Sequence, residues 1–242
     1  MQFPLPYAPL DRAYLRILGL SEDFLHAVLY QKNTHQIELE LQHISLPSLY
    51  HGQAPSQVQI AFWINQYNAW HLWLRKHTSL TGAALFRTKK ITIGKRTFSL
   101  DDIEHQILRG RKFKFGLGYL PSFWLNNELK KLAVAQPDYR IHFVLHCGAV
   151  SCPPLRIIQA EHLEEQLDTA ARSFISADTR IDHTRKQLHV SAIFGWYVGD
   201  FGGMRGLRQL MAKYHPSYQA EYSIRFKRYD WNPASSVADQ SK

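Results

Sequence analysis

The stretch that decides the fold is SQVQIAFWINQYNAWHLWLRKH, residues 56–77. Its apolar side chains fall on nearly all sides of a helix, which is typical of a helix buried inside a domain. Ser56 begins the run as a helix cap does. Asn65 and Asn68 lie three residues apart and so share one face. Because buried amides need hydrogen-bond partners, we expect the two to brace a loop or to face a cavity.

Helical patterns flank this segment on the N-terminal side and return later in the chain. Residues 11–30 have apolar positions at helical spacing, broken at Gly19 and restarted at Ser21, which predicts two short helices. Further helices are expected over 99–110, where Ser99 and Asp102 form a capping-box pattern, and over 121–134 and 161–175.

Strand patterns begin after the central helix and gather late in the chain. Hairpins are expected over 90–98 and 179–191, and single strands over 140–147 and 222–231. Helices first and strands late indicate an α+β fold, a central buried helix on a mainly antiparallel sheet. We expect one domain at 56–232, a helical N-terminal region at 1–55 packed on it, and a disordered tail at 233–242.

Composition limits the class of protein. The chain has 242 residues, of which 45% are hydrophobic and 20% charged, which excludes wholesale disorder. No run of about 18 apolar residues predicts a membrane span. The N-terminus lacks the basic and apolar regions of a signal peptide, so the default expectation is cytoplasmic, with a mature exported form left open.

The formal net charge of +9 is concentrated in one region. Nine Lys and Arg residues fall within 87–114, opposed there by three acids: Asp101, Asp102 and Glu104. Such a cluster predicts either a solvated face or a contact with an anionic partner. No nucleic-acid-binding motif accompanies it.

Both cysteines lie in RIHFVLHCGAVSCPPLR, residues 140–156. In a straight strand His142 and Cys147 would lie ~16 Å apart on opposite faces, so they form no dyad within it. If the chain reverses at 148–149, Cys152 returns toward His142 together with Ser151 and Arg156. A cationic neighbour such as Arg156 lowers a thiol pKa.

Four interpretations of this segment stay open from the residues alone. One is a thiol nucleophile, Cys152 or Cys147, with His142 as base and Asp200 as its orienting partner. The others are a Cys147–Cys152 disulfide or redox clip, a metal site that would add His146, and thiols that simply pack. The spacing matches no familiar metal motif, so no metal and no cofactor are predicted.

Five segments together resemble one family, the domain of unknown function DUF547. They are AFWINQYNAWHL, TFSLDDIEHQILRG, RIHFVLHCGAVSCPPLR, LEEQLDTAARSFI and HVSAIFGWYVGDFGG, in that order over roughly residues 56–203. The resemblance implies a distant similarity to papain-like and transglutaminase-like enzymes, with an α+β architecture. In a transglutaminase-like site the nucleophilic cysteine begins the central helix, and 56–77 contains none.

Two functions follow as hypotheses. The first is a thiol-dependent hydrolase or acyltransferase acting on amide or peptide-type substrates, with Asn65 and Asn68 supporting the cysteine loop. Trp196 and Tyr197 would line the cleft. The second is a non-catalytic binding module with a basic face at 87–114 and a structural cysteine loop. The sequence does not decide whether the protein is an enzyme.

Overall fold

The computed structural model describes residues 10–123, 127–215 and 217–233. Its α-helices are α1 (Arg12–Leu29), α2 (His35–His43), α3 (Ser56–His77), α4 (Gly82–Arg87), α5 (Asn127–Leu132), α6 (Leu163–Asp178), α7 (Ala192–Trp196) and α8 (Gly203–Tyr214). Tighter or wider helical turns are η1 (Leu46–Leu49), η2 (Asp102–Leu108), η3 (Tyr139–Phe143) and η4 (Ala160–His162). The strands are β1 (Ile91–Ile93), β2 (Arg96–Phe98), β3 (Arg180–Asp182), β4 (Gln187–Val190) and β5 (Ser223–Phe226).

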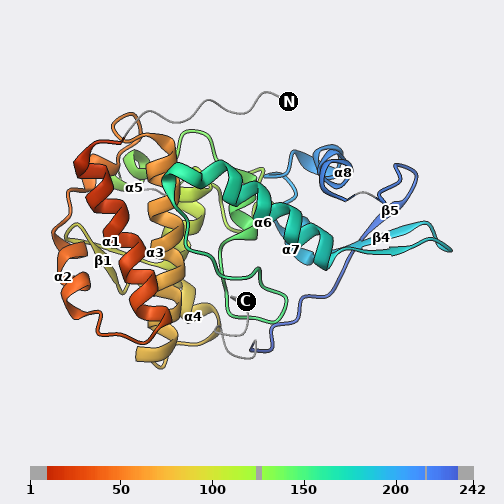
Figure 1. Ribbon diagram of the computed structural model, residues 1–242. Coiled ribbons are helices and arrows are strands. Elements are labelled where there is room, and N and C mark those ends of the chain that lie inside the picture. The colour runs from red at the N-terminus through yellow and green to blue at the C-terminus, as the bar shows by residue number, and fades with distance from the viewer. Residues whose placement is uncertain (1–9, 124–126, 216, 234–242) are drawn as a thin grey trace.

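The predicted central helix is α3, which begins at Ser56 and is buried over most of its length. Its main neighbour is α1, which lies beside it (Figure 1). An aromatic contact joins the two helices, with the rings of Phe24 and Trp70 separated by 4.8 Å. A helix that is apolar on most sides is stable only when other elements cover it, and α1 supplies the largest part of that cover.

The predicted break in the first helix is wrong, because α1 continues through Gly19. The hydroxyl of Ser21 donates to the carbonyl of Leu18, one turn back, at 2.7 Å. Ser21 is buried, and the amide of Asn65 on α3 reaches its oxygen at 3.4 Å. Ser21 therefore belongs to the contact between α1 and α3 and does not start a second helix.

The α+β class is confirmed, with helices dominating. Both predicted hairpins form, β1 with β2 and β3 with β4, and β5 adds to β4 in parallel. The strands make two small sheets, and in the described part of the chain the principal packing partner of α3 is α1. The expected sheet platform beneath the central helix is therefore wrong.

Residues 140–147 do not form the predicted strand. The segment begins as the short helix η3, because the carboxylate of Asp138 accepts a hydrogen bond from the Arg140 backbone N–H at 2.8 Å. Ile141, His142 and Phe143 are all buried, so a period-two pattern of inside and outside is absent. Continuous burial explains why the apolar run resembled a strand.

The predicted capping box at Ser99 and Asp102 is confirmed, since each side chain accepts from the other's backbone N–H at 3.0–3.1 Å. The helix it opens, η2, is wider than an α-helix, and the Arg109 N–H bonds to the Glu104 carbonyl five residues back. Wide turns of this kind often mark functional sites. Here the turn carries Glu104 and His105.

One hydrophobic core runs through the described residues, from Ile17 on α1 to Tyr214 on α8. The division into 1–55 and 56–232 stays a prediction, as does the tail, of which 234–242 lie outside the described residues. No helix in the described ranges is long and apolar enough to cross a membrane.

Candidate active site

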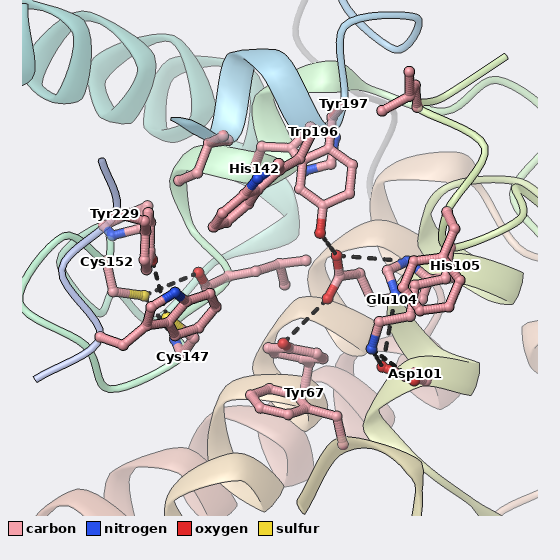
Figure 2. Close-up of a pocket in the computed structure, with 18 residues that line it drawn as sticks. Tyr67, Asp101, Glu104, His105, His142, Cys147, Cys152, Trp196, Tyr197 and Tyr229 are labelled. Carbon is pink, nitrogen blue, oxygen red and sulfur yellow. Dashed lines mark hydrogen bonds and ion pairs between the residues drawn. The ribbon is translucent and has the colours of Figure 1, made fainter. Parts of the chain in front are cut away.

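A cavity of about 420 Å³ lies beside α3, and η2 and the cysteine segment help to line it. Its walls are largely aromatic, and its polar groups are Asp101, Glu104, His105, Lys114, His142, Cys147 and Cys152, with several tyrosine hydroxyls. Figure 2 shows the two cysteines and Tyr229 on one side, with Glu104, His105 and Asp101 on the other. A concave site with convergent titratable groups is the expected form of an active site.

The two asparagines of α3 hold the segment that carries the cysteines. Asn68 donates to the carbonyl of Val144 and accepts from the N–H of His146, both at 2.9 Å. Asn65 does the same for Ile158, at 2.8 and 2.9 Å. The amides therefore fix both ends of residues 144–158 to one buried helix. All of these groups are buried, so the bonds are costly to break.

The chain reverses between the two cysteines. Gly148 has a φ of +75°, which favours glycine, and the N–H of Cys147 then donates to the sulfur of Cys152 at 2.6 Å. Cys147 Sγ also lies 3.1 Å from the hydroxyl of Tyr229. Both cysteines are free thiols, so the disulfide alternative is not formed in this structure.

The two thiols have opposite electrostatic environments. Cys147 is partly exposed, and its hydrogen bond with Cys152, aided by the Tyr229 hydroxyl, lowers its pKa to about 7 although burial opposes this. Cys152 is buried, and burial together with the neighbouring Cys147 raises its pKa well above the usual value. Since the thiolate is the reactive form, Cys147 is the better nucleophile of the pair.

His142 meets the orienting partner proposed for it. Its Nε2 lies 2.9 Å from Oδ2 of Asp200, and the same oxygen accepts from Nε of Arg109 at 2.6 Å. Burial lowers the pKa of His142 more than Asp200 raises it, so the imidazole is neutral at neutral pH. A neutral ring that donates from Nε2 to a carboxylate keeps its lone pair on Nδ1, the form a general base requires.

The ring of Tyr197 contacts both the His142 imidazole and the Arg109 guanidinium. The His142 ring stacks on it at 4.0 Å and 14°, and the Arg109 guanidinium lies 4.5 Å from its centre. Trp196, the other predicted aromatic, also lines the cavity and stacks with Trp231 at 5.6 Å. Both aromatic side chains therefore line the cavity.

Glu104 is a cavity residue that sequence reasoning missed. It accepts hydrogen bonds from the hydroxyls of Tyr197 at 2.7 Å and Tyr67 at 3.2 Å. Burial raises the pKa of Glu104, but His105, the Tyr197 hydroxyl and Arg109 together outweigh burial and lower it. An ionised carboxylate therefore faces the thiol cavity. The signal was its place inside the family segment TFSLDDIEHQILRG, where Glu104 was considered only as a countercharge to the basic cluster.

The predicted basic face is smaller than its sequence suggested. Arg109 is only 1% exposed and pairs with Asp200 inside the protein. Lys114 pairs with Asp101 at 2.6 Å, and Lys89 lies 3.6 Å from Asp102. Formal charge in a sequence window overestimated the exposed charge, because Arg109 is buried against the distant Asp200 and two acids of the window pair with Lys89 and Lys114.

Two predicted support residues lie outside the cavity lining. Ser151 instead accepts a hydrogen bond from the N–H of Asp230 at 3.0 Å, and so fastens the cysteine turn to the chain near the last strand. Arg156 is absent from the described lining, and Arg75 is the guanidinium that reaches the turn, at the carbonyl of Gly148.

The open metal interpretation finds no geometric support in its four residues. His146 Nδ1 bonds to the carbonyl of Pro153 at 3.0 Å, while His142 is engaged by Asp200. Within the described ranges, no three His, Cys, Asp or Glu side chains are grouped to hold a metal ion.

The comparisons with known proteins give one match. The family model described as "Protein of unknown function, DUF547" matches residues 52–175, just over half of the chain. That range contains α3, η2 and both cysteines, and it ends before Asp200 and Tyr229. No curated protein and no solved structure matches the chain.

Proposed function

The chain belongs to the DUF547 family, whose description assigns no activity, and from its cavity we propose that the protein is a cysteine-dependent hydrolase or acyltransferase. The nucleophile is Cys147, the general base is His142, and Asp200 positions the base. The substrate is an amide or ester carbonyl compound that enters the cavity.

One observation carries this proposal. A partly exposed thiol with its pKa lowered to about 7 shares a cavity with a neutral histidine that is bonded to a carboxylate. At neutral pH a large fraction of such a thiol is ionised, whereas an ordinary thiol with a pKa of ~8.5 is only a few per cent ionised.

The chemistry balances with these groups alone. Cys147 gives its proton to His142, and its thiolate attacks the carbonyl carbon. The carbon–nitrogen or carbon–oxygen bond then breaks, and the leaving group departs with the proton from His142. A thioester on Cys147 remains. Water or an acceptor amine attacks it as His142 takes the proton of the incoming group, and the proton returns to the departing thiolate.

Cys152 has a supporting role in this scheme. Its sulfur accepts the Cys147 N–H, and its interaction with the Cys147 thiol is the largest cause of the lowered pKa there. The amides of Asn65 and Asn68 keep the segment in place against α3. The non-catalytic alternative has less support, because ion pairs occupy part of the basic face that it requires.

Acyl-enzyme formation tests the proposal. The protein is mixed with p-nitrophenyl acetate, and its intact mass and peptide masses are followed over time. We expect one acetyl group on Cys147, none in Cys147→Ser, and slower but intact labelling in Cys152→Ser. His142→Gln should form the adduct more slowly and also hydrolyse it more slowly, because His142 accepts a proton in both steps. Acetylation that is absent, or that survives in Cys147→Ser, would overturn the proposal.

A further inference from the structure

Exposed apolar side chains are concentrated in one short loop beside the cavity. Of the fourteen large hydrophobic residues that are exposed in the described part of the chain, six lie within 113–123. They are Phe113, Phe115, Leu117, Tyr119, Leu120 and Phe123, with Phe115 66% and Phe123 80% exposed. Scattered apolar residues on a surface need no explanation, but a contiguous group indicates an interaction site.

The loop backbone is ordered by its own hydrogen bonds. The N–H of Phe113 donates to the carbonyl of Leu120 at 2.9 Å, and that of Ser122 donates to Arg111 at 2.7 Å. Lys112 and Pro121 form an antiparallel bridge between the same two sides. The apolar side chains are therefore presented to solvent by a closed turn.

The same loop is fixed to the active site. The N–H of Gly199 donates to the carbonyl of Leu117 at 2.7 Å. At Gly118 a Cβ would come within 2.5 Å of the backbone nitrogen of Asp200, so only glycine permits this approach. Phe115 and Leu117 also line the cavity. Whatever the loop binds is consequently held at the cavity that contains Cys147.

Cationic side chains alternate with the apolar ones. Arg111 is exposed, and Lys112 and Lys114 flank Phe113. The ammonium of Lys114 lies 5.7 Å above the Phe86 ring, so the end of α4, with exposed Arg87, is close by. Aromatic rings lie at the headgroup level of bilayers, and Lys and Arg beside them attract anionic lipids.

We propose that residues 111–123 dock the protein on an anionic lipid bilayer. Phe115, Tyr119, Leu120 and Phe123 enter the headgroup layer, and Arg111 and Lys112 contact lipid phosphates. Interleaved rings and cations match such a surface in both polarity and charge. Because the loop borders the cavity, the docked protein takes its carbonyl substrate into the cavity from the lipid phase. Such a substrate is an amphiphilic molecule. This last step rests on the proposed function, whereas the docking does not.

Vesicle sedimentation tests the docking. The full chain is mixed with phosphatidylcholine vesicles containing about one-third phosphatidylglycerol, and with vesicles of phosphatidylcholine alone. We expect sedimentation with the anionic vesicles that weakens as salt is added. Phe115→Ser or Phe123→Ser should each weaken partitioning about tenfold, from the apolar surface of one ring. Reversing both charges, Arg111→Glu with Lys112→Glu, should weaken it by at least about tenfold on anionic vesicles.

Matched substitutions outside the loop are the controls. Tyr30 is 65% exposed at the end of α1, and Lys32 is exposed nearby. Tyr30→Ser and Lys32→Glu should sediment like the wild type. Cys147→Ser should as well, so that docking and catalysis are tested separately. Far-ultraviolet circular dichroism establishes that each loop variant is folded.

Three outcomes would overturn the docking proposal. The first is that the wild type fails to sediment with anionic vesicles. The second is that the loop variants sediment as well as the wild type. The third is that the protein does not bind vesicles and light scattering finds a dimer that Phe115→Ser dissociates, which would make the loop a contact between two copies of the chain.

Discussion

Cys147 and Cys152 are five residues apart and differ in almost every property that controls thiol reactivity. Cys147 is partly exposed and close to the Tyr229 hydroxyl, whereas Cys152 is buried. A hydrogen bond to sulfur favours its ionised form, and burial disfavours it. The arrangement thus concentrates thiolate character on Cys147, the more exposed of two thiols that both line the cavity.

The pairing of Asp200 with Arg109 and His142 gives a prediction about stability. Asp200→Asn removes the carboxylate that both groups share and leaves the buried Arg109 guanidinium without its ion-pair partner. We expect the free energy of unfolding to fall by about 3 kcal/mol, as is typical when a buried pair is broken. Urea unfolding measures this directly.

The control for that change is Asp182→Asn. Asp182 pairs with Arg185 at the surface, at 3.4 Å, where a pair is worth little. Its loss should alter the unfolding free energy by no more than about 0.5 kcal/mol. Equal losses of unfolding free energy in the Asp200 and Asp182 variants would contradict a large contribution of the Asp200 contacts to stability.

Among the elements, the segment 144–158 and helix α3 form the unit on which the site depends. The two asparagine amides act at its ends, and the tight turn at Gly148 lies between them. A Cβ at Gly148 would lie 1.7 Å from Nη1 of Arg75, which donates to the same residue's carbonyl. The turn is therefore closed by backbone geometry that other residues do not reproduce.

Alanine substitutions at Gly148 in this turn and at Gly19 in α1 should change the free energy of unfolding in opposite directions. Gly148→Ala should lower the free energy of unfolding by at least about 1 kcal/mol, from a strained positive φ and the clash with Arg75. Gly19→Ala should raise it by about 0.5–1 kcal/mol, since α1 is continuous there and a Cβ meets nothing within 4 Å. Equal effects in thermal or urea unfolding would contradict the assigned turn.

Sequence patterns predicted the elements well where local rules dominate. The central helix, both hairpins and the capping box at Ser99 follow from periodicity, turn residues and capping chemistry. The strand predicted over residues 140–147 is wrong because a fully buried run has no periodicity that distinguishes a strand from short helical turns. The predicted break at Gly19 is wrong because packing on α3 overrides the low helix propensity of glycine.

At the scale of the whole molecule, buried histidines couple stability to pH. His71 lies within α3, where it is fully buried and stacks with the rings of Tyr67 and Phe86. Burial lowers the pKa of His71 to about 3. An unfolded chain has a histidine pKa of ~6.5, so the folded state binds fewer protons below that value.

The sign of this linkage defines the next prediction. The destabilisation that His71 causes is absent above about pH 6.5 and grows as the pH falls toward about 3, reaching about 2 kcal/mol at about pH 5. His71→Phe keeps an aromatic ring without the titration, so it should lose less stability between about pH 7.5 and about pH 5. His35→Gln changes an exposed histidine and should keep the wild-type decline. Unfolding in urea at both values compares them, and identical declines in all three proteins would exclude His71 as the cause.

The site itself could be predicted only in part. His142, Asp200, Trp196, Tyr197 and both cysteines were singled out, and all of them lie in or beside one cavity. Glu104, Tyr67, Tyr229 and the ion pair of Arg109 with Asp200 were missed, because their contacts join residues 37 to 93 positions apart in the sequence. Long-range contacts of this kind depend on packing that local patterns do not encode.

The measurement that tests the central claim most directly is the pH dependence of Cys147 alkylation in the native protein. Iodoacetamide is applied across about pH 5 to 9, and each cysteine peptide is quantified by mass spectrometry. Cys147 should react with a midpoint near pH 7 while Cys152 stays protected. Tyr229→Phe should move the midpoint upward because it removes a hydrogen bond to sulfur, and Tyr222→Phe, whose hydroxyl contacts His183, should not. A Cys147 midpoint at or above the free-thiol value of ~8.5, or preferential reaction of Cys152, would contradict the assignment of Cys147 as the nucleophile.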